Sequence, residues 1–147
     1  MNVILLNDNI YMGENYVVEH IGYVTKNIEK TANTFKVFGY VAENIVNDDT
    51  QKTRICFLRK DGDVSIELVE PYPENETMLK MLKKGATPYH TCYTVPDVQE
   101  AYAQLKDLGF TPLFSPVEAP AFDNRLICYF WKNDIGLIEV VEQEKGE

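Results

Sequence analysis

An internal repeat is the feature of this sequence that most constrains its fold. Aligning the 147-residue chain with itself at an offset of 70 positions places His20 on His90 and Gly39 on Gly109, with apolar residues on apolar residues between them. At an offset of 72 positions the apolar run 66–70 falls on 138–142, so one loop differs in length by two residues. Repeated units that cannot bury their apolar faces alone pack against each other. We therefore expect two similar modules that share one core.

Each half of the chain shows the same order of predicted elements. A β-branched and aromatic run predicts a strand over 16–24, and Asn27 is a candidate N-cap for a helix that ends at Gly39. In the second half Asp97 caps the equivalent helix, which ends at Gly109. Strands joined by hairpin turns complete the halves, and we expect them near 40–46, 53–59 and 64–70, then near 110–114, 126–131 and 136–142.

These elements predict an α+β fold made of two tandem βαβββ modules, at about 16–75 and 86–143. Each module is too small to cover both faces of its sheet, so the two together form one curved mixed sheet around a cleft, with the helices outside. We expect a single domain over 16–147, preceded by an N-terminal extension over 1–15.

Charge and cysteine content exclude several functions. The net charge is −9 and no basic strip is visible, so the sequence predicts no nucleic-acid partner. An apolar run at 3–6 is too short for a signal peptide or a membrane span, so we expect a cytoplasmic protein without a membrane partner. Three cysteines without CxxC spacing lie in strand-like runs and are expected to be buried free thiols: Cys56, Cys92 and Cys128.

Four metal-ligating residues occupy matched strand positions in the two halves. His20 and His90 lie in the first strand of each module, and Glu67 and Glu139 lie in the last. Because side chains alternate along a strand, the apolar neighbours of each glutamate can pack under a helix while the carboxylate faces the cleft. A buried carboxylate needs a counter-charge. The quartet therefore predicts a divalent metal site, with Ni, Co, Mn, Fe or Zn as the candidate ions.

The sequence resembles the vicinal oxygen chelate superfamily, which includes glyoxalase I, methylmalonyl-CoA epimerase, extradiol dioxygenases and antibiotic-resistance proteins. The resemblance covers about 17–143 and rests on four segments: EHIGYV at 19–24, IELVEP at 66–71, YHTCY at 89–93 and GLIEVVE at 136–142. It implies that His20, Glu67, His90 and Glu139 are the metal ligands and that Glu139 and Glu67 are the catalytic carboxylates. Related proteins often dimerise, so the resemblance also implies a homodimer.

The resemblance implies an enzyme that moves a proton next to a carbonyl group. The first expectation is an isomerase like methylmalonyl-CoA epimerase acting on an acyl thioester. The alternatives are a glyoxalase I-like lyase acting on a thiol hemithioacetal, and a non-catalytic small-molecule-binding protein. The epimerases use a second base after the first helix. This chain has Asp48 and Asp49 there, and we expect an exposed turn at that place.

The second half also carries candidates for substrate binding. The segment 111–125 is rich in proline and long for a connection, which is typical of a lid or binding loop. Arg125 at its end is the candidate anchor for a carboxylate or phosphate of the substrate, because guanidinium groups bind such anions in a bidentate manner. Three aromatic residues are expected to line either the pocket or the core: Phe114, Phe122 and Trp131.

Overall fold

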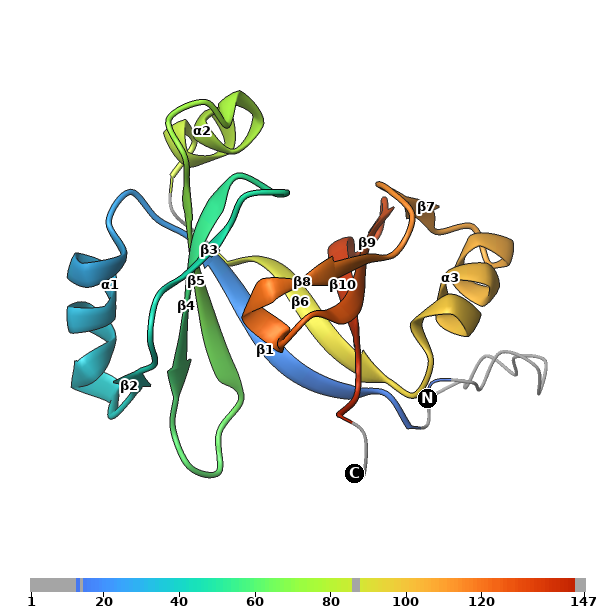
Figure 1. Ribbon diagram of the computed structural model, residues 1–147, viewed down its shortest axis with the longest axis horizontal. Helices are drawn as coiled ribbons and strands as arrows, with labels where there is room; N and C mark the ends of the chain where they lie inside the picture. Colours follow the sequence, from blue (N-terminus) through green and yellow to red (C-terminus); the bar gives the residue numbers. More distant parts are fainter. Residues whose placement is uncertain (1–12, 14, 86–87, 145–147) are drawn as a thin grey trace, which may run out of the picture.

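The two halves of the chain join edge to edge into one ten-stranded curved sheet (Figure 1). The computed structural model describes residues 13, 15–85 and 88–144. The strands are β1 (Val17–Val24), β2 (Val41–Ala42), β3 (Val46–Asp48), β4 (Thr53–Arg59), β5 (Ser65–Pro71), β6 (Pro88–Val95), β7 (Thr111–Pro112), β8 (Val117–Ala119), β9 (Arg125–Lys132) and β10 (Gly136–Glu142). The helices are α1 (Ile28–Phe35), α2 (Glu76–Lys83) and α3 (Val98–Asp107), with the 3₁₀ turns η2 (Lys36–Phe38) and η3 (Pro120–Phe122).

The strand order confirms the predicted duplication. β1 pairs in parallel with β5, and β6 pairs in parallel with β10, so each half places its first strand beside its last. The two first strands, β1 and β6, pair antiparallel and form the seam between the halves. The main path of the sheet runs β2-β4-β5-β1-β6-β10-β9-β7. The four strands that carry the predicted ligands are therefore neighbours in the middle of the sheet.

The N-cap residues and helix-ending glycines predicted from the sequence occupy those positions in the structure. The Asn27 side chain accepts a hydrogen bond from the Lys30 amide at 2.9 Å, and Asp97 accepts one from the Glu100 amide at 3.0 Å. The helical segments of α1 and α3 are each followed by a glycine with positive φ, 88° at Gly39 and 93° at Gly109. Residues with a Cβ atom rarely adopt this backbone conformation.

Helices α1 and α3 cover the outer face of the sheet, one on each half (Figure 1). Ile66 and Leu68 of β5 pack with Ile28 of α1, while Val140 of β10 belongs to the cluster under α3. A third apolar cluster, which includes Phe57 and Tyr129, lies on the inner face of the sheet. The alternation therefore leaves Glu67 and Glu139 on the inner, concave side, as the sequence predicts.

Several details differ from the sequence-based expectations. Helix α2 was not predicted, because it lies in the connection between the repeats and has no counterpart in either half. Each half has two short strands before its final hairpin where one was expected. The segment 111–125 contains β7, β8 and η3, and both strands pair with β9, so two short pieces of it are part of the sheet.

Two further expectations concern burial and membrane association. All three cysteines are buried and free, as predicted. Among the residues that the structure describes, no helix has the length and apolar character needed to cross a bilayer. The N-terminal extension predicted over 1–15 lies almost wholly outside the described residues.

Candidate metal centre

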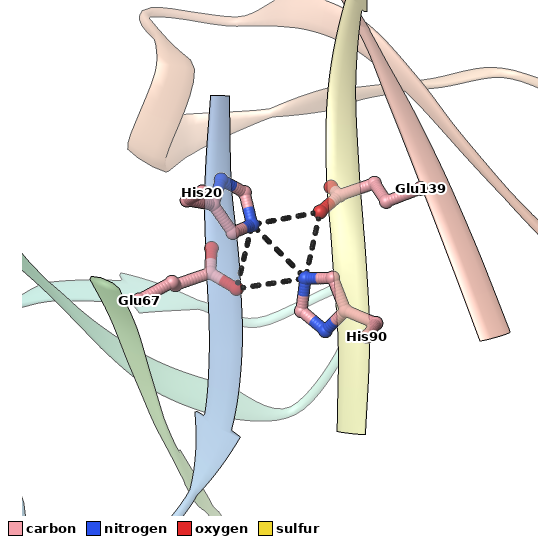
Figure 2. Close-up of side chains that lie close together, drawn as sticks. All are labelled: His20, Glu67, His90 and Glu139. Carbon is pink, nitrogen blue, oxygen red and sulfur yellow. Dashed lines mark hydrogen bonds and ion pairs between the residues drawn. The ribbon is translucent and has the colours of Figure 1, made fainter. Parts of the chain in front are cut away.

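Four adjacent strands direct the predicted ligands to one point on the concave face (Figure 2). His20 comes from β1, Glu67 from β5, His90 from β6 and Glu139 from β10. All four side chains are buried, with between 0% and 4% of their surface exposed. Two residues from each half therefore contribute to a single cluster.

The donor atoms of the cluster lie close together. The two imidazole Nε2 atoms are 2.9 Å apart. Glu139 Oε1 lies 3.1 Å from His20 Nε2 and 3.0 Å from His90 Nε2, and Glu67 Oε1 lies 3.4 Å from both nitrogens. Donor atoms at ~2.0–2.2 Å from one ion lie about 2.8–3.6 Å from their neighbours in tetrahedral or octahedral coordination. These five distances are compatible with donors around a common metal ion, and all four donor atoms lie within 4.8 Å of one another.

Hydrogen bonding supports the same conclusion. Glu67 Oε1 and Glu139 Oε1 are buried, and neither accepts a hydrogen bond of good geometry from the residues that the structure describes. A buried carboxylate oxygen without a donor costs free energy unless a cation contacts it. Two nitrogen and two oxygen donors suit several divalent transition metals and do not select one of them. The cluster could therefore bind a metal ion whose identity the fold leaves open.

The charges of the cluster shift the pKa values of its members. Burial raises the pKa of the Glu139 carboxyl, but the adjacent imidazoles of His20 and His90 lower it more, to about 2. Burial lowers the pKa of His20, while the charge of Glu67 and contacts with Cys92 and Glu139 raise it well above its ordinary value. The raised pKa favours a protonated His20, and the lowered pKa keeps Glu139 ionised, which is the form of a carboxylate that can bind a cation.

Aromatic rings and one glycine hold the imidazoles in place. His20 lies between Phe57 and Phe122, with ring centroids 5.2 and 5.8 Å away. The His90 ring lies directly over Gly22 of the neighbouring strand, where a Cβ atom would come within 2.8 Å of His90 Nε2 and still closer to Cε1 and Nδ1. Only glycine at this position leaves room for the ring.

A largely apolar cavity of about 160 Å³ opens beside the cluster. Glu67 forms part of its wall, and the phenols of Tyr89 and Tyr129 lie in the same wall. Burial, followed by the charges of Glu67 and Glu139, raises the pKa of Tyr89 well above its usual value, so this phenol keeps its proton. The remaining wall comes from β3 and the turn after it, β4, β5, β10, α2 and residues between 113 and 122. A small organic molecule in the cavity would therefore lie next to one of the candidate ligands.

Comparison with protein-family models identifies the fold family. Residues 19–129 match the model of the Glyoxalase/Bleomycin resistance protein/Dioxygenase superfamily. The chain belongs to this superfamily. Comparison with curated protein sequences gives no significant match.

Solved structures of the superfamily share the fold at low sequence identity. A hypothetical protein from Bacillus halodurans is 20% identical, with 91% of this chain and 99% of that chain covered and a TM-score of 0.79. The methylmalonyl-CoA epimerase from Mycobacterium tuberculosis is 22% identical, with 86% and 87% covered and a TM-score of 0.77. A variant of the Streptomyces coelicolor epimerase in complex with 2-nitronate-propionyl-CoA is 22% identical, with 88% and 96% covered and a TM-score of 0.76. At these identities the likeness establishes the superfamily fold.

The expectation of an exposed turn at Asp48 and Asp49 is wrong for Asp48. Its side chain is 1% exposed, lies at the end of β3 and lines the cavity. It accepts hydrogen bonds from the amide and the side chain of Gln51, at 2.9 and 3.1 Å. Asp49 is exposed, as expected. A polar sequence such as 47–52 gives no signal for this burial, because β3 packs against η3 of the other half.

The structure does not bring Arg125 to the cluster or to the cavity wall. Its guanidinium donates to the carbonyl oxygens of Phe122 and Glu142, at 3.1 and 2.9 Å, and these contacts tie η3 to the end of β10. Its role as an anion anchor stays a prediction. Of the three aromatic candidates, Phe114 and Phe122 line the cavity, whereas Trp131 is 47% exposed and lies elsewhere.

The sequence reasoning missed the residues of α2 in the cavity wall and Glu19 beside His20. Thr77, Met78 and Met81 form one face of α2 toward the cavity. The apolar spacing of 78 and 81 in a capped segment is the signal that could have found them. Glu19 Oε1 lies 2.9 Å from His20 Nδ1, although strand alternation places neighbouring residues on opposite faces.

Proposed function

We propose that this protein is a metal-dependent enzyme that moves a proton next to a carbonyl group, acting on an acyl thioester as an isomerase like methylmalonyl-CoA epimerase. One observation carries the proposal. Two buried carboxylate oxygens, which have no hydrogen-bond donor among the described residues, and two imidazole nitrogens converge beside an apolar cavity. This arrangement joins a charge-stabilising centre to groups that can accept a proton.

His20, Glu67, His90 and Glu139 would hold the ion. A divalent metal bound there would act as a Lewis acid and stabilise the negative charge that develops on a substrate carbonyl oxygen. These four residues lie on neighbouring hydrogen-bonded strands, so their positions are set by the sheet. The aromatic rings around the imidazoles exclude water from the inner side of the cluster.

Glu139 and Glu67 are the proposed proton carriers. A carboxylate that ligates weakly or is displaced when substrate binds can accept a proton from the carbon next to the carbonyl. An isomerase needs a second group on the opposite face of that carbon, to return the proton. Asp48 is the candidate, because it is the other acidic residue in the described cavity wall beside Glu67.

The acyl thioester is proposed from two observations. The cavity wall is mainly apolar, which suits a short acyl chain. The Streptomyces coelicolor structure named above holds 2-nitronate-propionyl-CoA, and a methylmalonyl-CoA epimerase of the same fold has been solved with methylmalonyl-CoA. A homodimer in solution is proposed on the resemblance to the superfamily.

A glyoxalase I-like lyase is the second candidate. The observation that favours it is the presence of a carboxylate in both halves, since Glu67 and Glu139 are related by the internal repeat and both contact the two imidazoles. Two such carboxylates could share the proton transfer on a thiol hemithioacetal without any use of Asp48.

Solvent exchange distinguishes these functions. The purified protein is loaded in turn with Ni²⁺, Co²⁺, Mn²⁺, Fe²⁺ and Zn²⁺, and deuterium uptake from D₂O into a panel of acyl thioesters is measured by mass spectrometry. We expect metal-dependent exchange that falls at least ~100-fold in Glu139→Gln, because a positioned acid or base contributes 10²–10⁴-fold. Glu118→Gln, an exposed carboxylate on β8, is the matched control and should exchange normally.

Three results would contradict the proposal. Methylglyoxal–thiol turnover without exchange in any thioester would favour the lyase. Tight binding of thioesters with neither activity would favour a binding protein. Equal metal titration of the wild-type protein and His90→Ala would refute the metal site itself.

A further inference from the structure

The pairing of β1 with β6 is interrupted twice, each time at the residue before a candidate ligand. Val18 pairs with Tyr93 and His20 with Cys92, so Glu19 is an extra residue on β1. Further along, Gly22 pairs with His90 and Tyr23 with Pro88, so Tyr89 is an extra residue on β6. A β-bulge bends the strand locally and changes the direction in which the bulged side chain points. Each half of the repeat therefore uses a bulge to bring the residue before its histidine to the imidazole ring.

In the first half this residue is a carboxylate that is itself held. Glu19 Oε1 lies 2.9 Å from His20 Nδ1, and Arg59 Nη1 donates to Glu19 Oε2 at 3.3 Å. Arg59 is fixed by a hydrogen bond to Ser65 Oγ at 2.8 Å and by the face of the Phe57 ring. These contacts form a continuous chain from Arg59 through Glu19 to the imidazole.

In the second half the equivalent residue is an aromatic one. The Tyr89 ring packs edge-on against His90, with centroids 4.4 Å apart. Within the part of the chain that the structure describes, the buried Nδ1 of His90 has no hydrogen-bond partner. The two pseudo-symmetric halves thus support their histidines differently. A carboxylate accepts a hydrogen bond from His20, whereas His90 is held by ring packing among the described residues.

A hydrogen bond at Nδ1 determines what Nε2 does. A carboxylate that accepts a hydrogen bond from Nδ1–H fixes the tautomer whose Nε2 carries a free lone pair, and it also fixes the orientation of the ring. His20 Nε2 is the atom that faces the cluster. The hydrogen bond from His20 to Glu19 therefore leaves the Nε2 lone pair free and oriented to bind a cation.

We propose that Glu19, held by Arg59, is a positioning residue that makes His20 the tightly held histidine of the metal site, while His90 is the loosely held one. This inference rests on the proposed metal site and adds a residue that the ligand quartet does not contain. Glu19 contacts neither the cavity nor the convergence point of the donor atoms, so its effect on a metal ion acts through His20.

Metal affinity in Glu19→Gln tests the proposal, with Glu43→Gln as the matched control. Glu43 also pairs with Arg59, with Oε1 3.2 Å from Nε, but it does not contact His20. Both variants remove one negative charge beside the same arginine. Competition with a chromophoric chelator should show Zn²⁺ binding weakened ~10–100-fold in Glu19→Gln, the usual effect of losing such a partner, and unchanged in Glu43→Gln.

Two further measurements separate positioning from a general structural effect. In the zinc-loaded protein, the Nδ1–H proton of His20 should give a downfield NMR resonance in water, which shifts in Glu19→Gln and stays in Glu43→Gln. Glu19→Asp keeps the charge and should recover part of the affinity. Equal affinities in Glu19→Gln and Glu43→Gln would overturn the positioning role alone. A wild-type protein that binds no divalent metal would overturn both this inference and the proposed function.

Discussion

Replacing Gly22 with alanine tests the geometry of the metal centre most directly. The added Cβ would lie 2.8 Å from His90 Nε2 and nearer still to Cε1 and Nδ1. Because non-bonded atoms of this size settle at about 3.5 Å or more, the ring must retreat by at least ~0.7 Å. Metal–ligand distances tolerate only about 0.2 Å. We therefore expect Gly22→Ala to remove His90 from the ligand set, with metal affinity lowered more than ~100-fold.

The stability of the metal-free protein gives a second measure of the same clash. Overpacking of this kind costs about 1–3 kcal/mol, so Gly22→Ala should lower the free energy of unfolding by that amount. Alanine in a strand is otherwise more favourable than glycine by roughly 0.5–1 kcal/mol. In a His90→Ala background, where no ring meets the new methyl group, the same substitution should be neutral or stabilising.

The assay is a double-mutant cycle on Gly22 and His90, with urea denaturation for stability and chelator competition for metal affinity. The two substitutions should be strongly non-additive in both measurements. Wild-type metal affinity in Gly22→Ala would refute the conclusion that His90 is a ligand held over Gly22. Additive losses of stability would show that the ring does not occupy this place.

Three other predictions concern a helix cap, pH and Arg125. Asp97→Ala removes the N-cap of α3 and should cost about 1 kcal/mol in urea denaturation, with metal affinity unchanged. The low pKa of Glu139 implies that its stabilising contribution is present above the unfolded pKa near 4.5 and is lost as pH falls toward 2. Acid titration of the metal-free protein should show this loss, and Glu139→Gln should abolish it. Arg125→Ala removes two hydrogen bonds to carbonyl groups and should cost about 2 kcal/mol of stability in urea denaturation. It should leave the KM of an active thioester unchanged, and a tenfold rise in KM would restore Arg125 as an anion anchor.

The sequence predicted the parts of the fold that repeat. The alignment of His20 with His90, together with the paired glutamates and helix-ending glycines, was enough to predict the modules, the curved sheet and the concave face that carries the quartet. These features depend on local patterns that occur twice, so each half supported the interpretation of the other.

The sequence did not predict features that arise where the halves meet. The strand β3, which ends at Asp48, packs against η3 more than 60 residues away, and no local pattern in the sequence predicts that contact. The bulges at Glu19 and Tyr89 depend on the register between β1 and β6, whereas simple alternation places both side chains on the wrong face. Helix α2 occurs once, so the repeat gave no support for it.

The seam between β1 and β6 also has a consequence for folding. The four ligands are divided between two segments that meet only when this antiparallel pair forms, so the binding site does not exist in either half alone. An ion that binds only the assembled site stabilises it by about 2.7 kcal/mol at a free concentration of 100 times its Kd. That free energy acts entirely on the association of the halves. A metal bound there would therefore strengthen the pairing of β1 with β6, and its removal would weaken the junction by the same free energy.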